Sequence, residues 1–186
     1  MLFRSIRGQI HPEPEIARSM VVQLADLLRR LLSAGQRDFS LLSEELSFAR
    51  MYLELQQQRF GDRLTVILPD DGAQPELWVP SLILQPLVEN AVLHGLAGHD
   101  GPVEIRLEVC SDADRLIMRI VNTTANLAVT AGENIGLGNI RERLAVQFGS
   151  QASLSAHRAG TGAWVAEISM PALLEHAPAT RAGNTS

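Results

Sequence analysis

The chain has 186 residues, of which 46% are hydrophobic and 20% charged, so it is long enough and apolar enough to build a globular core. The 16 Lys and Arg residues are outnumbered by 21 Asp and Glu and form no basic stripe, which argues against a nucleic-acid partner. A single cysteine, Cys110, excludes an internal disulfide and favours the cytoplasm. No uncharged stretch is long enough to span a bilayer, so a membrane anchor would have to lie outside this sequence.

Residues 15–33 are predicted to form a helix whose apolar residues are spaced three and four apart. This stripe contains Ala17, Met20, Leu24, Leu27 and Leu31, and it is widened by Val21, Ala25, Leu28 and Leu32. Residues 41–60 repeat the pattern after a turn at 34–38, so the two segments predict an antiparallel helical hairpin. Because its apolar surface is broader than two helices can cover, we expect two copies to form a four-helix bundle. The alternative is that a monomeric hairpin packs on the rest of the chain.

Beyond residue 61 the pattern predicts an α+β two-layer sandwich, in which helices cover one face of a mostly antiparallel sheet. Pro80 suits the first turn of a helix over 80–97, and Pro86 within this helix implies a kink or a later start. The other expected elements are a helix at 137–148 and strands at 64–68, 103–109, 116–120, 152–156 and 163–169. The chain therefore divides into a hairpin at 1–61, a sandwich domain at 62–171 and a disordered tail at 172–186.

Three polar residues interrupt the apolar helix at 80–97 and are candidates for chemistry. Asn90 and His94 lie four residues apart and share a face, whereas Glu89 is turned about 100° away. An amide oxygen suits a hard cation such as Mg²⁺, and an adjacent carboxylate can order or deprotonate a water near that ion. The alternative is that Glu89 and Asn90 form a solvated edge and that His94 is a structural, partly buried histidine.

A second candidate is the Gly-containing segment at 134–144, which runs directly into a predicted helix. Free amide groups and the helix dipole at such a start favour anions, so phosphate would bind there. The segment lacks the spacing of a Walker loop or a dinucleotide fingerprint, and alone it also fits a plain turn. Together the two segments predict the halves of a nucleotide and magnesium site, with flexible residues between them as a lid.

These two segments resemble the catalytic domain of sensor histidine kinases of the LytS type, which belong to the GHKL ATPase superfamily. The residues that carry the resemblance are Glu89-Asn90-Ala91, His94-Gly95 and Gly136-Leu137-Gly138-Asn139-Ile140-Arg141-Glu142-Arg143-Leu144. The hairpin also resembles that family's dimerisation segment, through Tyr52-Leu53-Glu54-Leu55-Gln56 and Arg59-Phe60. The resemblance covers residues 13–171 and implies a GHKL (Bergerat) sandwich behind a helical hairpin. It further implies transfer of the γ-phosphoryl group of ATP to a histidine and onward to a response regulator.

The resemblance also implies roles for single residues, with ATP and Mg²⁺ as cofactors. Asn90 would bind Mg²⁺, Glu89 would act near the attacking group or its water, and His94 would face the phosphates. Adenine would lie over the sheet near Asn122. The remaining nucleotide-binding residues would be the lid backbone and a Gly-Thr element near the last strand: Gly136, Leu137, Gly138, Asn139 as a cap, and Gly160, Thr161, Gly162.

Three features depart from the family's pattern. Asn122-Thr123-Thr124 replaces the usual Asp-x-Gly element, so an amide oxygen would accept the hydrogen bond from the adenine amino group. Asn134 stands where the lid commonly has another glycine. The Pro-His-Phe-Leu-Phe-Asn element that holds the phosphoacceptor histidine is absent, and His11 lies in a proline-flanked turn that is typical of a surface loop.

The sequence therefore predicts the catalytic core of a sensor histidine kinase that lacks its sensor and its own acceptor histidine. Its expected partners are a response regulator and a second copy of the hairpin, and any membrane attachment would come from a sensor region outside this chain. The alternative is a degenerate, non-catalytic module that pairs with a complete kinase through residues 15–60. A serine kinase of an anti-sigma system shares the ATPase fold, but the hairpin argues against it.

Overall fold

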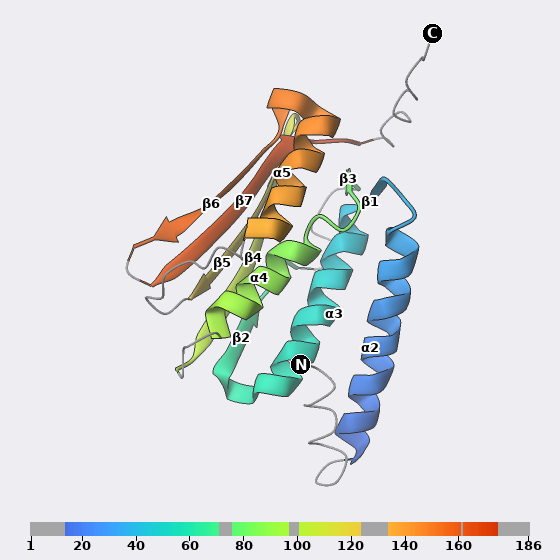
Figure 1. The fold of residues 1–186 in the computed structure, drawn as a ribbon, viewed down its shortest axis with the longest axis vertical. Coiled ribbons are helices and arrows are strands. Elements are labelled where there is room, and N and C mark those ends of the chain that lie inside the picture. Colours follow the sequence, from blue (N-terminus) through green and yellow to red (C-terminus); the bar gives the residue numbers. More distant parts are fainter. Residues whose placement is uncertain (1–13, 71–75, 97–100, 124–133, 161, 175–186) are drawn as a thin grey trace.

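A computed structural model describes residues 14–70, 76–96, 101–123, 134–160 and 162–174 of the chain. One layer is a five-stranded sheet in the order β2-β4-β5-β7-β6, and helices α4, α5 and α3 cover one of its faces (Figure 1). The helices are α2 (Pro14–Ala34), α3 (Leu42–Phe60), α4 (Gln85–Leu96) and α5 (Asn134–Phe148). The strands are β1 (Phe39–Leu41), β2 (Leu64–Ile67), β3 (Trp78–Pro80), β4 (Val103–Ser111), β5 (Arg115–Thr123), β6 (Ser153–Ala159) and β7 (Ala163–Pro171). The predicted α+β sandwich is confirmed.

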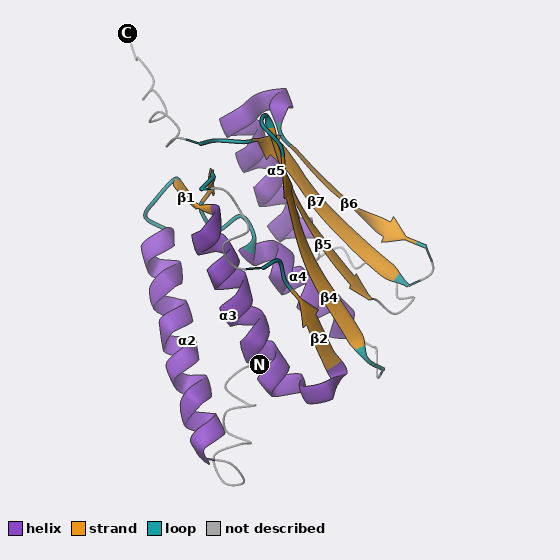
Figure 2. Ribbon diagram, turned by 180° about the vertical axis from the view of Figure 1, so that it is seen from behind, coloured by secondary structure: helices purple, strands orange, loops and turns teal. Residues whose placement is uncertain are grey.

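The five-stranded sheet is mixed, because β2 pairs with β4 in parallel while all other neighbours are antiparallel. Seen from the opposite side, its outer face carries none of the described helices (Figure 2). A second sheet of two short strands pairs β1 with β3 and joins the hairpin to the rest of the chain. Among the described helices, none combines the length and the apolar character needed to cross a membrane.

The helix predicted at 80–97 begins later than Pro80, which ends strand β3 instead. Pro80 pairs with Phe39 of β1, and both residues are buried. Helix α4 begins at Gln85, so Pro86 lies in its first turn, where a missing N–H costs no hydrogen bond. Of the two interpretations of Pro86, the later start is confirmed.

A single apolar core extends from the sheet through α4 and α5 into α3, which contributes Leu42, Ala49 and Leu53. Helix α2 contacts this assembly differently, because its buried Met20 packs on Leu55 of α3 in a separate small cluster. Helix α3 therefore packs on the sandwich, whereas α2 lies on the far side of α3 (Figure 1). The division of the chain at residue 61 stays a prediction, since α3 shares the core of the sandwich.

The end of the described chain is attached to the small sheet. Ala172 donates its backbone N–H to Asp114 O at 3.0 Å, and Leu173 O accepts from Trp78 N at 2.8 Å. The disordered tail was predicted from Ala172 onward, so these two residues are held more firmly than expected. Residues 175–186 lie outside the described part of the chain.

Gly95 marks the closest approach of α4 to the sheet. A Cβ atom placed on Gly95 would lie 2.7 Å from Val103 Cγ1 and 3.3 Å from Thr123 O, closer than ordinary van der Waals contact. The absence of a side chain at this position therefore sets the distance between α4 and strands β4 and β5. The same contact places α4 next to Asn122, whose Nδ2 atom would lie 3.6 Å from that Cβ.

We predict that Gly95→Ala lowers the free energy of unfolding by about 1–3 kcal/mol, because α4 must move away from the sheet to admit the methyl group. Gly138→Ala is the matched control, since a Cβ at Gly138 of α5 meets nothing within 4 Å. There the higher helix propensity of Ala should leave stability unchanged or raise it by up to about 1 kcal/mol. Urea denaturation followed by circular dichroism measures both effects. Equal stabilities of the two variants would contradict the close packing at Gly95.

Candidate functional site

Helix α4 presents a narrow polar face between the apolar surfaces that bury it. Asn90 is half-buried on this face, and its Nδ2 atom is buried without a hydrogen-bond partner among the described residues. His94 follows one turn later and is also half-buried. A buried amide that makes no hydrogen bond is costly unless something else satisfies it, so Asn90 is a candidate ligand-binding residue.

The start of α5 packs directly on this face of α4. A Cβ placed on Gly136 would lie 3.5 Å from Pro86 Cβ and 4.0 Å from Asn90 Nδ2. Gly136 thus allows the backbone of α5 to pass close to Asn90. Leu137 is only 4% exposed and anchors this turn in the core. The two segments singled out in the sequence are therefore adjacent in space.

Helix α5 begins at Asn134, three residues before the predicted start. Gly136, Leu137 and Gly138 consequently lie within its first turns rather than in a loop. Asn139 is the sixth residue of the helix and is exposed, and its role as a cap of the lid stays a prediction. Most of the predicted lid, at 124–133, lies outside the described residues.

Asn122 on β5 is fully buried beside Gly95. Its Nδ2 atom donates to Thr123 O at 3.0 Å, whereas its Oδ1 atom has no partner among the described residues. This hydrogen bond fixes the amide so that the unpaired atom is an acceptor. Gly95 and Asn90 are five residues apart on α4, or about 7.5 Å along the helix axis. These two positions are also about 140° apart around the helix, so the unsatisfied amides at Asn90 and Asn122 lie at different faces of α4.

The register of the sheet places further residues near Asn122, at the end of β5. Asn122 pairs with Trp164 of β7, so both side chains lie on the face that the helices cover. Gly160 and Gly162 belong to the turn that joins β6 and β7, and Gly160 adopts a φ of 62°. Thr123 pairs with Ala163 next to this turn. The Gly-Thr element is thus beside Asn122, while Thr161 itself lies outside the described residues.

Sequence reasoning did not identify Trp164 as a site residue. Alternation along β7 places Ala166, Ile168 and Met170 in the core, and Trp164 continues that series toward the turn. The signal was available, because a rare aromatic residue stood in phase with buried residues directly after the Gly-Thr element.

Glu89 is exposed on α4 and accepts a hydrogen bond from Gln85 Nε2 at 2.8 Å. Across the contact with α3 it faces Tyr52. Burial, reinforced by the negative charge of Glu89 and opposed by Arg59, raises the pKa of Tyr52 from 10.0 to about 12. Arg59 in turn stacks over Phe60, with Cζ 4.5 Å from the ring centroid. Helix α3 therefore borders the site with a phenol and a guanidinium that the sequence reasoning had treated only as part of a dimerisation segment.

The donor set at this site suits a metal that is shared with a ligand. Among the described residues, no group of three or more His, Cys, Asp or Glu side chains gathers closely enough to hold a metal ion alone. Mg²⁺ commonly keeps several waters and combines one or two protein oxygens with substrate phosphates. Asn90 would fit that mode of binding through its Oδ1 atom, whereas its unpaired Nδ2 atom is a donor that suits a phosphate oxygen.

Comparison with known proteins agrees with this geometry. The family described as Histidine kinase matches residues 2–64. Sensor histidine kinase YpdA of Escherichia coli is 31% identical over 157 residues, which is 78% of this chain and 27% of that protein. Sensor histidine kinase YesM of Bacillus subtilis is 33% identical over 143 residues, or 74% of this chain and 25% of that protein. The chain is related to the sensor histidine kinases. It spans about a quarter of the length of these two relatives.

Solved structures of histidine kinases share the fold. The catalytic domain of histidine kinase ThkA in a nucleotide-free form aligns with a TM-score of 0.57 and 12% identity, covering 74% of this chain and 99% of that one. Histidine kinase ThkA in complex with response regulator protein TrrA aligns with a TM-score of 0.52 and 13% identity, covering 86% of this chain and 50% of that one. The α3, α4, α5 and sheet assembly is therefore a fold of histidine kinase catalytic domains.

We predict that Glu89→Gln lowers the pKa of Tyr52 below the value of about 12 but leaves it above 10.0, because burial is the larger cause. Tyr52 is the single tyrosine of the chain, so the ultraviolet absorbance of tyrosinate reports this group alone. Glu54→Gln, on the exposed side of α3, is the control and should leave the titration unchanged.

The same shift predicts how stability depends on pH. Because the folded pKa is raised, this contribution to stability is complete below pH 10 and is lost as the pH rises toward 12. Unfolding by urea at several pH values should show this decline, and Tyr52→Phe should remove it. A decline of the same size in Tyr52→Phe would assign it to other groups.

Proposed function

We propose that this chain is the ATP- and Mg²⁺-binding catalytic core of a sensor histidine kinase of the LytS type, with residues 62–171 as the catalytic domain and the hairpin as a dimerisation segment. One observation carries the proposal. Asn90 of α4 and Asn122, which lies beside Gly95 of the same helix, each have a buried amide atom that no described residue satisfies, and Gly136 faces one of them. A nucleotide with a polar base at one end and phosphates at the other would satisfy both.

The adenine end would be bound by Asn122. Its Nδ2 atom is engaged with Thr123 O, so Oδ1 is left to accept a hydrogen bond from the amino group of the base. If guanine bound there instead, its carbonyl oxygen would face Asn122 Oδ1, and two acceptors cannot form a hydrogen bond with each other. Trp164, on the same face of the neighbouring strand, offers an aromatic surface to the base. These residues therefore favour adenine over guanine.

The phosphate end would be bound by Asn90, His94 and the start of α5. Asn90 would supply one oxygen ligand to Mg²⁺, and the ion would neutralise phosphate charge during transfer. Gly136 and Gly138 let the phosphates approach the backbone of α5, while His94 lies on the same side of α4 as Asn90. Glu89, next to Asn90 but turned toward Tyr52, would orient the attacking group or its water.

The chain would transfer phosphoryl groups together with other proteins. The ThkA structure contains a response regulator, which supports a response regulator as the final acceptor here. Val21, Leu28 and Leu32 of α2 are 51%, 50% and 73% exposed and form a second apolar stripe beside the one that packs on α3. We infer that this stripe pairs with a second hairpin, which would also bring an acceptor histidine from another protein to the site. His11 lies outside the described residues.

We predict that Asn90→Ala abolishes magnesium-dependent binding of a non-hydrolysable ATP analogue, because the ion loses its protein ligand. Isothermal titration calorimetry with and without Mg²⁺ measures the effect, and circular dichroism checks that the fold is intact. Gln58→Ala, which removes an exposed amide from α3, should bind as the wild type does. Unchanged affinity in Asn90→Ala would refute its role as a metal ligand, and no binding to the wild type would refute the nucleotide site.

Transfer is tested by mixing the chain with a related kinase that retains its acceptor histidine but has a disabled ATP site. Labelled ATP should label the partner's histidine only when this chain is present. Leu28→Glu, on the exposed stripe of α2, should abolish labelling by preventing pairing while leaving nucleotide binding intact. Pairing and nucleotide binding without any transfer would instead favour the non-catalytic module that assists a complete kinase.

A further inference from the structure

A buried carboxylate joins the hairpin to the helix that carries the candidate site. Glu45, in the first turn of α3, is only 3% exposed. Its Oε1 atom accepts hydrogen bonds from Leu82 N at 2.7 Å and Ser40 Oγ at 2.9 Å, and its Oε2 atom accepts one from Leu84 N at 3.2 Å. Buried carboxylates are rare unless they are well satisfied, so this one holds a specific arrangement in place.

Glu45 binds the N–H group of Leu84, directly before α4, and the N–H group of Leu82 in the loop that precedes it. The first helical hydrogen bond of α4 runs from Val88 N to Leu84 O, so Leu82 and Leu84 occupy the N-terminal cap region. A local Ser, Thr, Asp or Asn usually satisfies such groups. Here the cap comes from a residue 39 positions before Leu84, on a different helix. The negative charge of Glu45 also lies at the positive end of the α4 dipole.

Helix α5, which carries Gly136 of the candidate site, also contacts residues 81–84, the loop before α4. Arg143 of α5 donates from Nη1 to Ser81 O at 2.6 Å. Burial lowers the pKa of Arg143, and the negative charge of Glu45 partly opposes that effect. Residues 81–84 are thus held between a carboxylate of α3 and a guanidinium of α5.

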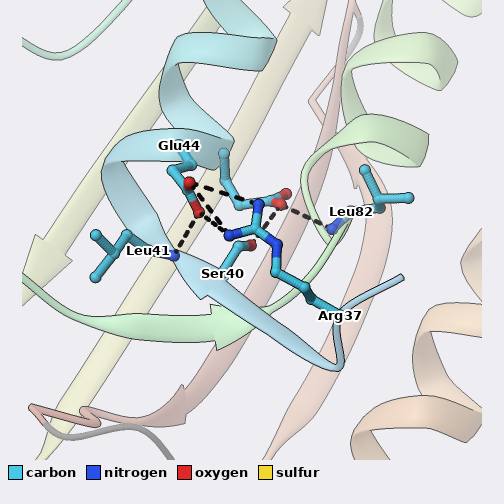
Figure 3. Close-up of polar contacts among 6 residues, drawn as sticks. Arg37, Ser40, Leu41, Glu44 and Leu82 are labelled. Carbon is cyan, nitrogen blue, oxygen red and sulfur yellow. Dashed lines mark hydrogen bonds and ion pairs between the residues drawn. The ribbon is translucent and has the colours of Figure 1, made fainter. Parts of the chain in front are cut away.

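The backbone of this loop is strained. Leu82 has a φ of 58°, and it is the one residue other than glycine with positive φ in the described part of the chain. Such a conformation persists only where surrounding contacts enforce it. Figure 3 shows Leu82 in this arrangement, beside Ser40 and opposite the start of α3. Release of Glu45 would therefore allow the loop, and with it the start of α4, to relax.

We propose that Glu45 is a positioning residue that couples the helical hairpin to the nucleotide site. Helix α4 carries Asn90 and α5 carries Gly136; α4 packs directly on α3, and residues 81–84 also link both helices to the start of α3. Nucleotide binding between α4 and α5 then restrains the start of α3, and a movement of the hairpin alters nucleotide affinity by the same factor, because coupling is reciprocal. This inference rests on the proposed nucleotide binding.

The neighbouring glutamate provides a matched control. Glu44 lies at the same helix start but turns to the surface, where it accepts from Leu41 N at 3.2 Å and forms an ion pair with Arg37 at 3.2 Å (Figure 3). Glu44→Gln and Glu45→Gln remove the same charge from adjacent positions. Only Glu45→Gln affects the α4 cap. It replaces the oxygen that accepts from Leu84 N by an amide N–H₂ group, so that two donors face each other.

The test is hydrogen–deuterium exchange of the full chain, measured with and without a saturating magnesium complex of a non-hydrolysable ATP analogue. In the wild type and in Glu44→Gln, the analogue should slow exchange in α4 and α5 and also slow it by about fivefold or more in residues 40–48. In Glu45→Gln, slowing in α4 and α5 should remain while slowing in residues 40–48 is lost. Calorimetry on the same samples establishes how much analogue is bound.

Two results would overturn the coupling alone: protection confined to α4 and α5 in the wild type, or protection of residues 40–48 in Glu45→Gln equal to that in the wild type. No binding of the analogue to the wild type would overturn the proposed function, and the coupling with it. If Glu45→Gln does not fold, Arg143→Met is used instead, because it removes the hydrogen bond from α5 to Ser81 O in the same loop. It should then retain protection in α4 and lose it in residues 40–48, and full protection there would refute the proposal.

Discussion

The position of helix α4 determines most of the architecture. One surface of α4 touches the sheet at Gly95, a second touches α3, and its first turn touches α5 through Pro86 and Gly136. A helix that is buried on three sides has little freedom to rotate or slide, because protein interiors are close-packed. The narrow polar face that remains, which carries Asn90, is therefore fixed relative to all three neighbours.

Local sequence patterns predicted the larger elements well. The helices α2 and α3 and the long strands follow from spacing of apolar residues, since each buries one regular face. The short strands β1 and β3 were not predicted, because three residues carry no periodicity and their partners lie about forty residues apart. The start of α4 was placed at Pro80 for a related reason. A local rule for helix starts could not detect a cap supplied by Glu45 from another helix.

The candidate site could be predicted from the sequence less completely than the larger helices and strands. Helical spacing placed Asn90 and His94 on one face, and the anion-binding character of the segment at 134–144 suggested that it shares a site with them, although Gly136 lies 46 positions after Asn90. The structure brings these residues together through core packing. Tyr52 and Trp164 were missed because their relevance depends on the α3–α4 contact and on the register of β5 with β7, which no local pattern encodes.

The hydrogen bond from Asn122 to Thr123 O carries a consequence for how this protein could evolve. An ionised aspartate in place of Asn122 would have no proton to give to Thr123 O. A single replacement of Asn122 by aspartate would set a carboxylate against a backbone carbonyl within a fully buried strand. A change from Asn122 to aspartate would therefore become neutral only after the backbone at Thr123 had changed.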